Sequence, residues 1–409
     1  MNSRKVIVIG GGPSGMMAAA NAASKGYRVV LLERNEKLGK KLYITGKGRC
    51  NITNVCELDD FFSNIPRNSR FLYSAIHRYT SQDLIHFLHQ EGLETVIERG
   101  NRVFPASNKA SDVTKTLEKY LKKMKVEIKY NFRVQHILCQ AGKAIGITGF
   151  DGTSLASDIV ILCTGGVSYP STGSTGDGYE MAKELGHEIT PVLPSLIPLV
   201  TKESWVRSLQ GLALKNVCLS AFVKKKETFK ETGELLFTHF GISGPLVLLL
   251  SSHIADKNLS DIVITIDLKP ALNEEQLNNR LVRDFEKYNR KQFKNALADL
   301  LPQKMIPIFI ELSHISGDKY VHQISKIERK ALVGLMKSLE IRIVQMRPIE
   351  EAIITRGGIN IKNIDPSTMA SKLIEGLYFA GEVIDVDGYT GGFNLQIAFS
   401  TGFLAGHSC

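Results

Sequence analysis

The chain has 409 residues, of which 43% are hydrophobic and 22% are charged, and its formal net charge is +10. These fractions are typical of a folded globular protein, and the length favours two or three domains. No apolar run approaches the ~20 residues that a membrane-spanning helix needs, so we expect no membrane partner.

The first residues, "MNSRKVIVIGGG", lead directly into a strand and a glycine turn, so we expect no signal peptide. The six cysteines are scattered without metal-ligand spacing, which favours free thiols, a cytoplasmic location and no metal site. The visible clusters of positive charge are "LKKMK" (121–125) and "KKK" (224–226), which we interpret as solvated faces. We therefore do not expect a nucleic acid partner, although the positive charge keeps that alternative open.

A strand, a glycine turn, a helix and a second strand open the chain. The stretch "KVIVIGGGPSGMMAAANAASKGYRVVLLERN" predicts strands over 5–9 and 28–33 and a helix over 14–25. In its G-x-G-x-x-G turn, Gly10 permits the tight turn, Gly12 lets backbone amides approach a pyrophosphate, and Gly15 lets the helix pack close to the strand. The helix N-terminus offers free N–H groups to a phosphate. Glu33, at the end of the second strand, can accept hydrogen bonds from a ribose diol.

Two further segments favour a long cofactor. In "LGKKLYITGKGRCNITN" (38–54), glycines alternate with lysines and an arginine, so this loop can wrap phosphates and present backbone donors to a polar ring; the alternative is a basic surface loop. The apolar strand of "DIVILCTGG" ends at Thr164, Gly165 and Gly166, and glycines there let another group approach the strand end closely.

The C-terminal segment "GLYFAGEVIDVDGYTGGFNLQIAFSTG" (376–402) distinguishes FAD from NAD. A buried strand ends at Gly381 and Glu382, and this carboxylate is placed to bind a polyol, which NAD lacks. A glycine turn then precedes a helix that starts near Asn394 and that we expect over 392–402. The positive end of that helix suits the edge of an isoalloxazine ring, which gains negative charge on reduction. Because FAD has an adenosine end and a flavin end, it explains motifs at both ends of the chain.

These motifs resemble a known family. The stretches "GGGPSG", "TGKGRCNITN", "CTGGVSYPSTGSTGDGY", "LFTHFGISGP" and "GEVIDVDGYTGGFNLQIAFSTG" are similar to the flavoproteins with two dinucleotide-binding domains and a glutathione-reductase-type FAD domain. More closely, they resemble the bacterial NAD(P)/FAD-dependent, aminoacetone-oxidase-like oxidoreductases, which include a bile-acid dehydroxylation flavoprotein. The resemblance implies a bound FAD, a discontinuous FAD domain with an insert, and a backbone contact to adenine at Val134.

We therefore predict an α/β protein with a discontinuous Rossmann-like FAD-binding domain and an inserted domain that is part β-barrel-like and part α-helical. The FAD domain comprises residues 1–191 and 355–409. Alternating runs predict the β part of the insert over 192–270 and 341–354, and helical patterns predict its helical part over 271–340. The proline-marked "TPVLPSLIPLV" (190–200) marks the crossing into the insert.

The predicted cofactor-binding residues are Gly10, Gly12, Pro13, Ser14, Gly15, Glu33, Arg34, Lys41, Thr45, Gly46, Gly48, Arg49, Cys50, Asn51, Val134, Thr164, Gly165, Gly166, Gly381, Glu382, Gly391, Gly392, Asn394, Leu395 and Gln396. No catalytic residue is assigned, and the candidate is His239, which titrates near neutral pH. A structural, hydrogen-bonding histidine is the alternative. Cys50 and Cys56 have five residues between them and are either two free thiols, with Cys50 beside the flavin, or a redox disulfide.

The predicted function is an FAD-dependent oxidoreductase that passes hydride or electrons through a tightly but non-covalently bound FAD to a small organic substrate. No second strand–G-x-G-x-x-G–helix unit follows in the sequence. NAD(P)H, if it is the electron donor, would therefore dock transiently over the flavin. The alternatives are an FAD-dependent RNA-modifying enzyme and a non-catalytic flavin-binding redox protein. The sequence leaves open the substrate, the electron donor and the oligomeric state.

Overall fold

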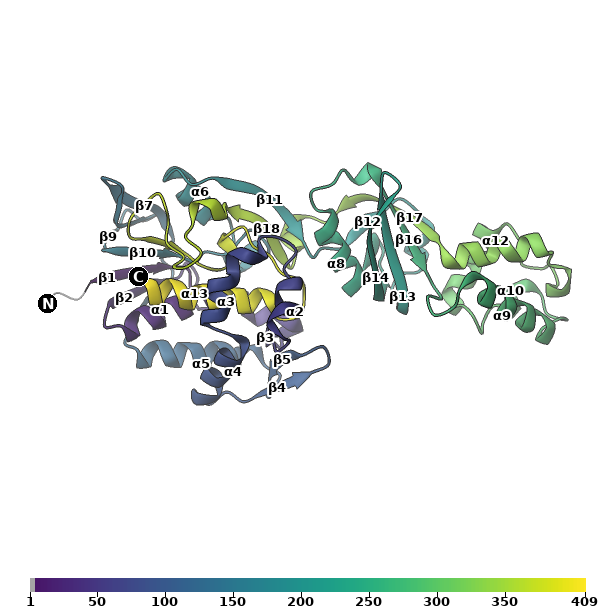
Figure 1. Cartoon of the computed structure of the whole chain (residues 1–409), viewed down its shortest axis with the longest axis horizontal. Coiled ribbons are helices and arrows are strands. Elements are labelled where there is room, and N and C mark those ends of the chain that lie inside the picture. The colour runs from purple at the N-terminus through teal and green to yellow at the C-terminus, as the bar shows by residue number, and fades with distance from the viewer. Residues whose placement is uncertain (1–3) are drawn as a thin grey trace. The chain divides into compact units, whose positions relative to one another are not determined.

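The computed structural model describes residues 4–409, which form two compact units. Of the described residues, the first unit contains 4–195 and 349–409, and the second contains 196–348. Each unit has its own hydrophobic core. Figure 1 shows the helices and strands along the chain. Within residues 4–409, no helix combines the length and the apolar character needed to cross a bilayer.

A five-stranded parallel sheet forms the centre of the first unit. Its strand order is β19 (Leu377–Phe379), β10 (Ile159–Leu162), β1 (Lys5–Ile9), β2 (Arg28–Leu32) and β6 (Glu127–Lys129). The strand sequences "KVIVI" and "IVIL" are almost fully buried, as expected for parallel strands that are covered on both faces. The expected strand over 5–9 and the Rossmann-like fold class are therefore confirmed.

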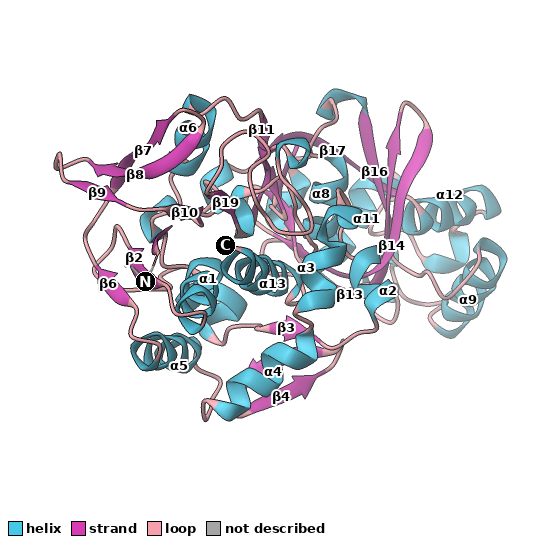
Figure 2. Ribbon diagram, turned by 60° about the vertical axis from the view of Figure 1, so that its left-hand side comes forward, coloured by secondary structure: helices cyan, strands magenta, loops and turns pink. Residues whose placement is uncertain are grey.

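Helices α1 (Pro13–Ser24) and α13 (Phe393–Ser408) pack on each other and contact this sheet, and α5 (Ala110–Lys123) packs on α1 (Figure 2). Helices α1 and α13 approach very closely, because a Cβ on Gly402 would lie 2.3 Å from the carbonyl oxygen of Ser14. A Cβ on Gly406 would lie 2.2 Å from the carbonyl oxygen of Ala18. Small residues on both helices therefore allow this contact between the first and the last helix of the chain.

Smaller elements complete the first unit. Its other helices are α2 (Leu58–Ser63), α3 (Tyr73–Arg78), α4 (Ser81–Gln90) and α6 (Asp177–Glu184). One antiparallel sheet contains β3 (Thr53–Asn54), β5 (Arg102–Pro105) and β4 (Thr95–Glu98), and another contains β7 (Val134–Gln140), β8 (Lys143–Gly149) and β9 (Ser154–Ala156). Short 3-10 helices include η1 (Leu42–Gly48) and η9 (Gly381–Val383).

The second unit is a closed antiparallel barrel with helices. Its strands, in barrel order, are β12 (Leu199–Thr201), β15 (Gly241–Ser243), β14 (Lys226–Phe237), β13 (Ala213–Val223), β16 (Ile262–Asp267) and β17 (Leu339–Met346). Its helices are α7 (Trp205–Ser208), α8 (Pro245–Ile254), α9 (Glu274–Lys287), α10 (Phe293–Ala296), α11 (Ile306–Ser313) and α12 (Lys326–Lys337). Both α9 and α12 begin at a capping box, which satisfies the first backbone N–H groups of the helix.

The unit boundaries differ from the expected ones at 191/192 and 354/355. Strand β11 (Ile189–Ser195) pairs antiparallel with β18 (Ile354–Ile359), and both belong to the first unit. Residues 192–195 and 349–354 therefore lie with the FAD-domain segments rather than with the insert. The prolines of the crossing segment fall partly inside β11, whose register shifts between Thr190 and Leu193, so they did not mark the boundary itself.

Candidate cofactor and active site

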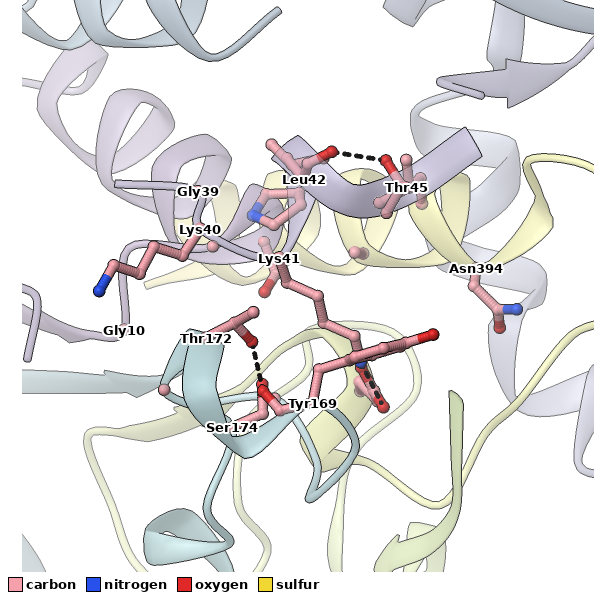
Figure 3. Close-up of a pocket in the computed structure, with 18 of the residues that line it drawn as sticks. Gly10, Gly39, Lys40, Lys41, Leu42, Thr45, Tyr169, Thr172, Ser174 and Asn394 are labelled. Atoms are coloured by element: carbon pink, nitrogen blue, oxygen red, sulfur yellow. Dashed lines mark hydrogen bonds and ion pairs between the residues drawn. The ribbon is translucent and has the colours of Figure 1, made fainter. Parts of the chain in front are cut away.

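The first unit holds a cavity of about 760 Å³ at the carboxyl ends of β1, β2 and β10 (Figure 3). Ile9, Leu32 and Cys163 line it where these strands end. Its walls also come from the β1–α1 turn, from η1, from β5 and from the turn that precedes α13. In open α/β sheets, ligands bind at the carboxyl ends of the strands, so this position and volume are those of a cofactor site.

The three glycines of the first turn have different surroundings. Gly10 has a φ of +102°, and a Cβ there would lie 2.5 Å from the carbonyl oxygen of Cys163. A Cβ on Gly15 would lie 1.9 Å from the carbonyl oxygen of Gly10, which shows how closely α1 packs on the turn. A Cβ on Gly12 would meet nothing within 4 Å, and Gly12 lines the cavity as the N-cap residue of α1. Gly12 therefore leaves open space for a ligand at the positive end of the helix.

Charged groups at one end of the cavity are paired. The buried carboxylate of Glu33 accepts hydrogen bonds from the backbone N–H of Gly11 at 2.8 Å and of Asn35 at 2.8 Å. Asp177 forms ion pairs with Arg34 at 3.3 Å and with Arg133 at 2.8 Å. Burial alone would raise the pKa of Asp177, but hydrogen bonds from Arg133 and from a threonine hydroxyl outweigh it and hold this pKa below its usual range. The carboxylate of Asp177 is therefore held ionised.

An ion pair crosses the middle of the cavity. Lys41 Nζ lies 2.8 Å from Glu382 Oε2 and 2.6 Å from Ser168 Oγ. The backbone N–H of Thr355 donates to Glu382 Oε1 at 2.9 Å. Lys41 and Glu382 both line the cavity, although 341 residues separate them in the chain. The carboxylate that we expected to bind a polyol is thus already held by a cation, and a polyol at this place would meet the pair.

Two buried side-chain oxygens of the cavity lining lack partners among the described residues. The side chains of Asn51 and Thr164 line the cavity, and within residues 4–409 neither Asn51 Oδ1 nor Thr164 Oγ1 has a hydrogen-bond partner. Buried polar atoms in folded proteins are nearly always hydrogen-bonded, so both atoms point to a bound polar group. Figure 3 shows Asn394, in the first turn of α13, on the same side of the cavity as Thr45, and Leu395 also belongs to the lining.

Most of the predicted cofactor-binding residues line the cavity. These are Gly10, Gly12, Pro13, Ser14, Glu33, Arg34, Lys41, Thr45, Gly46, Arg49, Asn51, Val134, Thr164, Gly165, Glu382, Gly391, Gly392, Asn394 and Leu395. The predicted residues Gly15, Gly48, Cys50, Gly166, Gly381 and Gln396 are not among the lining residues.

The non-lining residues serve the fold. A Cβ on Gly166 would lie 2.2 Å from Thr355 Oγ1, and a Cβ on Gly381 would lie 2.5 Å from Ser14 Oγ, so these glycines permit close packing. The backbone N–H of Gln396 donates to the carbonyl oxygen of Gly392 at 3.1 Å. The expectation that the Gln396 amide reaches a ring edge is therefore wrong, because that amide already closes the first turn of α13.

The candidate His239 and the two cysteines are not among the lining residues. His239 belongs to the 196–348 unit, where its ring packs edge-on against Phe240. Cys50 and Cys56 are both free thiols. Cys50 is fully buried, and burial raises its pKa to about 12. Among residues 4–409, no cluster of three or more His, Cys, Asp or Glu residues could hold a metal ion.

Sequence reasoning missed part of the lining. The unpredicted residues include Ile44, Asn35, Lys47, Arg102, Phe104, Arg133, Tyr169, Asp177, Ile353, Ile354, Tyr389 and Thr390. Ile44 is 44% exposed and Ile353 is 38% exposed, so both present apolar surface to the cavity. "TGKGRC" and "GYTGG" lie next to several of these residues, and that proximity was the available signal.

Comparisons with known proteins agree with this architecture. The family model described as "HI0933-like protein Rossmann domain" matches residues 4–408. The chain is 32% identical to the 3-dehydro-bile acid delta(4,6)-reductase of Clostridium scindens, over 99% of this chain and 98% of that protein. It is 31% identical to the ribosomal RNA dihydrouridine synthase of Haemophilus influenzae, over 97% of this chain and 96% of that protein.

Two solved structures share the fold. A flavocytochrome c3 fumarate reductase in its open conformation superposes with a TM-score of 0.52 at 18% identity, covering 99% of this chain and 78% of that one. The 3-ketosteroid-delta4-(5alpha)-dehydrogenase of Rhodococcus jostii RHA1, in complex with 4-androstene-3,17-dione, gives a TM-score of 0.51 at 15% identity, covering 99% and 96% of the two chains.

Proposed function

The chain belongs to the HI0933-like family of Rossmann-domain flavoprotein oxidoreductases, and we propose that it uses a non-covalently bound FAD to reduce a carbon–carbon double bond next to a carbonyl group in a small, largely apolar molecule. The observation that carries this proposal is a cavity that suits FAD and that ends in exposed isoleucines.

The lining residues fit FAD. The open space beside Gly12 suits a pyrophosphate, and Glu33 suits a ribose diol. Glu382 would meet the ribityl chain, and Asn51 Oδ1, which is buried without a partner, suits a ring N–H. When bound, FAD supplies hydride transfer from its reduced ring. The chain's own residues bind and orient the cofactor and hold water away from it.

The chemistry of the lining supports non-covalent binding. No histidine is among the cavity-lining residues of the described chain. The lining cysteine, Cys163, is 3% exposed, and burial raises its pKa to about 12. A thiolate is the nucleophilic form of cysteine, and this thiol is almost wholly protonated at neutral pH. We expect denaturation to release about one intact FAD per chain, and recovery of FMN would contradict the cofactor.

The type of reaction follows from what the two relatives have in common. The name 3-dehydro-bile acid delta(4,6)-reductase describes reduction of alkenes in conjugation with a ring ketone. A dihydrouridine differs from uridine by two hydrogens across a double bond that is conjugated with a ring carbonyl. Both names describe addition of hydride and proton across an activated double bond. We extend this shared chemistry, rather than either substrate, to this chain.

The lining favours an apolar substrate. Ile44 and Ile353 both line the cavity while remaining more than a third exposed, and Ile354 and Leu395 also belong to the lining. Full burial of an exposed isoleucine is worth about 1.5–3 kcal/mol, and a ligand that covers the exposed part of these two side chains would gain a corresponding fraction. A flat hydrocarbon ring system would cover these side chains, whereas a nucleotide base would cover them less completely.

The electron donor in this proposal is NAD(P)H, docking transiently. The test is anaerobic stopped-flow mixing of the holoenzyme with NADH or NADPH, followed at the flavin band, and then mixing of the reduced enzyme with 4-androstene-3,17-dione. We expect reduction by one nucleotide and reoxidation by the enone, but not by the corresponding saturated ketone. A reduced flavin that survives the enone and reacts only with oxygen would contradict a reductase.

The uneven charge of the chain supports RNA as a second candidate substrate. Residues 196–348 contain 23 lysines and arginines and 16 aspartates and glutamates, so they carry +7 of the net charge of +10. Positive charge concentrated in one unit is the electrostatic pattern of a nucleic-acid binder. Filter binding of ribosomal RNA fragments at several salt concentrations separates the candidates. Affinity that falls steeply with salt, with no reoxidation by the enone, would favour RNA.

A further inference from the structure

The backbone of Tyr169 has a conformation that a bulky residue rarely adopts. Its φ is 52° and its ψ is 61°, in the left-handed region. The backbone N–H of Tyr169 donates to the carbonyl oxygen of Glu350 at 3.0 Å. Its carbonyl oxygen accepts from the backbone N–H of Thr172 at 2.8 Å and from its hydroxyl at 2.7 Å. These bonds hold a residue in a strained conformation, and such strain concentrates at functional sites.

The side chain of Tyr169 lies in the cavity. Figure 3 shows it beside the end of Lys41, with the ring directed toward the part of the cavity where Asn394 lies. The residue is half-buried, and its hydroxyl makes no hydrogen bond to any residue in the range 4–409. A phenol held in a cavity by a strained backbone, with its hydroxyl left free, is available to a ligand.

Several other polar groups in the cavity are engaged, although the Thr164 hydroxyl, a much weaker acid than a phenol, is not. Lys41 is ion-paired with Glu382 at 2.8 Å, and Asp177 is ion-paired with Arg133 at 2.8 Å. The hydroxyl of Thr45 donates to the carbonyl oxygen of Leu42 at 2.7 Å. The lowered pKa of Asp177 leaves it no proton to give at neutral pH, and a lysine that leaves its carboxylate partner would leave an unpaired charge in the cavity. Tyr169 differs from these groups because it offers a neutral, unengaged O–H.

We propose that Tyr169 is the proton donor of the double-bond reduction, an inference that rests on the proposed function. Its Oη–H bond breaks as a C–H bond forms at the alkene carbon next to the carbonyl group. The other alkene carbon receives hydride from the reduced cofactor, so the substrate gains two hydrogens and the cofactor is oxidised. The resulting phenolate then takes a proton from water. A positioned acid of this kind typically contributes about 10²–10⁴-fold to the rate.

The surroundings keep this hydroxyl protonated until it is used. Burial, and then the nearby charge of Glu351, raise the pKa of Tyr169 above its usual value near 10. The phenol is therefore neutral through the physiological range. We expect the rate of the proton-dependent step to stay level from neutral pH to mildly alkaline pH and to fall only where the phenol ionises.

The first test is Tyr169→Phe, which keeps the ring and removes the proton. We expect unchanged FAD content, unchanged flavin reduction by dithionite and by NAD(P)H, and reoxidation by 4-androstene-3,17-dione that is slower by about 100-fold or more. Reoxidation at the wild-type rate would overturn the inference while leaving the proposed function intact. If the enone did not reoxidise the reduced flavin of the wild-type enzyme, both the proposed function and this inference would be overturned.

Tyr389→Phe is the matched variant, because Tyr389 is a second phenol in the same lining. A loss of reoxidation in Tyr389→Phe but not in Tyr169→Phe would assign the proton to Tyr389 and overturn the inference. A fluorinated tyrosine at position 169, whose hydroxyl is more acidic, should move the alkaline fall of the rate to lower pH. Its ¹⁹F resonance should also shift when the saturated ketone binds to the oxidised holoenzyme. An unmoved pH profile and an unmoved resonance would show a purely structural tyrosine.

Discussion

The glycine turn before α1 and the glycine turn before α13 differ in what surrounds their glycines. Gly12 has a φ of −78°, and a Cβ there would meet nothing within 4 Å. Gly392 has a φ of +103°, and a Cβ there would lie 2.4 Å from the backbone carbonyl of Thr53. The first glycine leaves room for a ligand, whereas the second is required by the packing of the chain itself. Two similar glycine motifs can therefore be required for different reasons, one by ligand binding and the other by packing.

Replacing Gly392 by valine should give the largest effect. The side chain would collide with the backbone of Thr53 and would occupy a left-handed conformation, so we expect the apoprotein to lose about 2–4 kcal/mol of its free energy of unfolding. Urea unfolding of the cofactor-free protein measures this loss. An apoprotein as stable as the wild type that nonetheless fails to hold FAD would show that Gly392 faces the ligand and would remove the contrast with Gly12.

Replacing Gly12 by valine should separate binding from folding. The backbone suits any residue, and the new side chain would project into the cavity. We expect FAD to bind about 100-fold more weakly, equivalent to about 2.7 kcal/mol, with the apoprotein's stability changed by less than about 0.5 kcal/mol. Equilibrium titration of the apoprotein with FAD measures the affinity. Gly334→Val, where a Cβ also meets nothing but lies outside the cavity, should leave FAD affinity unchanged.

Removal of Glu33 or Glu382, the acids near these turns, should have a smaller effect on FAD affinity. Glu33→Ala and Glu382→Ala each remove charge-assisted hydrogen bonds worth about 1.5–3 kcal/mol, so we expect FAD affinity to fall about tenfold or more in each. The Glu382 change also strands Lys41, so Lys41→Met should restore part of the loss in the double variant. Additive losses would mean that the ion pair is independent of cofactor binding. Unchanged affinity in Glu382→Ala would mean that this acid does not meet the ribityl chain.

The smallest expected effect is the change in the free energy of unfolding of the apoprotein with pH. It shows how much of the apoprotein's stability is independent of either glycine turn. Burial lowers the pKa of His187, which is 2% exposed, against the opposing effect of a hydrogen bond with the backbone of Ala182. The unfolded chain takes up the proton near pH 6.5 and the folded chain only at lower pH, so this contribution to stability is present above that value and is lost as pH falls.

We expect this histidine to lower the wild-type free energy of unfolding by up to about 1.4 kcal/mol between pH 7.5 and pH 5.5, and we expect a smaller fall in His187→Gln. Urea unfolding at both pH values gives the comparison. An equal fall in the variant would show that other groups account for the pH dependence.

Structural features that depend on residues adjacent in the sequence could be predicted from the sequence. The strand over 5–9, the turn through Gly15 and the helix that follows were predictable because their alternation, glycine spacing and proline are local signals. The same reasoning placed both halves of one α/β fold at the two ends of the chain.

The parts that depend on distant partners could not be predicted. Gly392 is explained by Thr53, and the Lys41–Glu382 pair joins residues 341 positions apart. Tyr169 was not predicted as a site residue, because nothing in "SYPSTG" indicates that the backbone of this tyrosine has a left-handed conformation. Gln396 was misassigned because the motif gives the start of a helix but not which amides its first turn consumes.

The close contact between α1 and α13 has a consequence for biosynthesis. In the sequence, α1 lies near the N-terminus and α13 near the C-terminus, so the 196–348 segment is translated between them. That segment is continuous, so it can fold as soon as it leaves the ribosome, whereas the Rossmann unit must wait for α13. Until then, the alanine-rich surface of α1 remains uncovered in the nascent chain. Ribosome-bound chains that stop before Phe393 should therefore be protected from protease over the barrel but cleaved within the first strands.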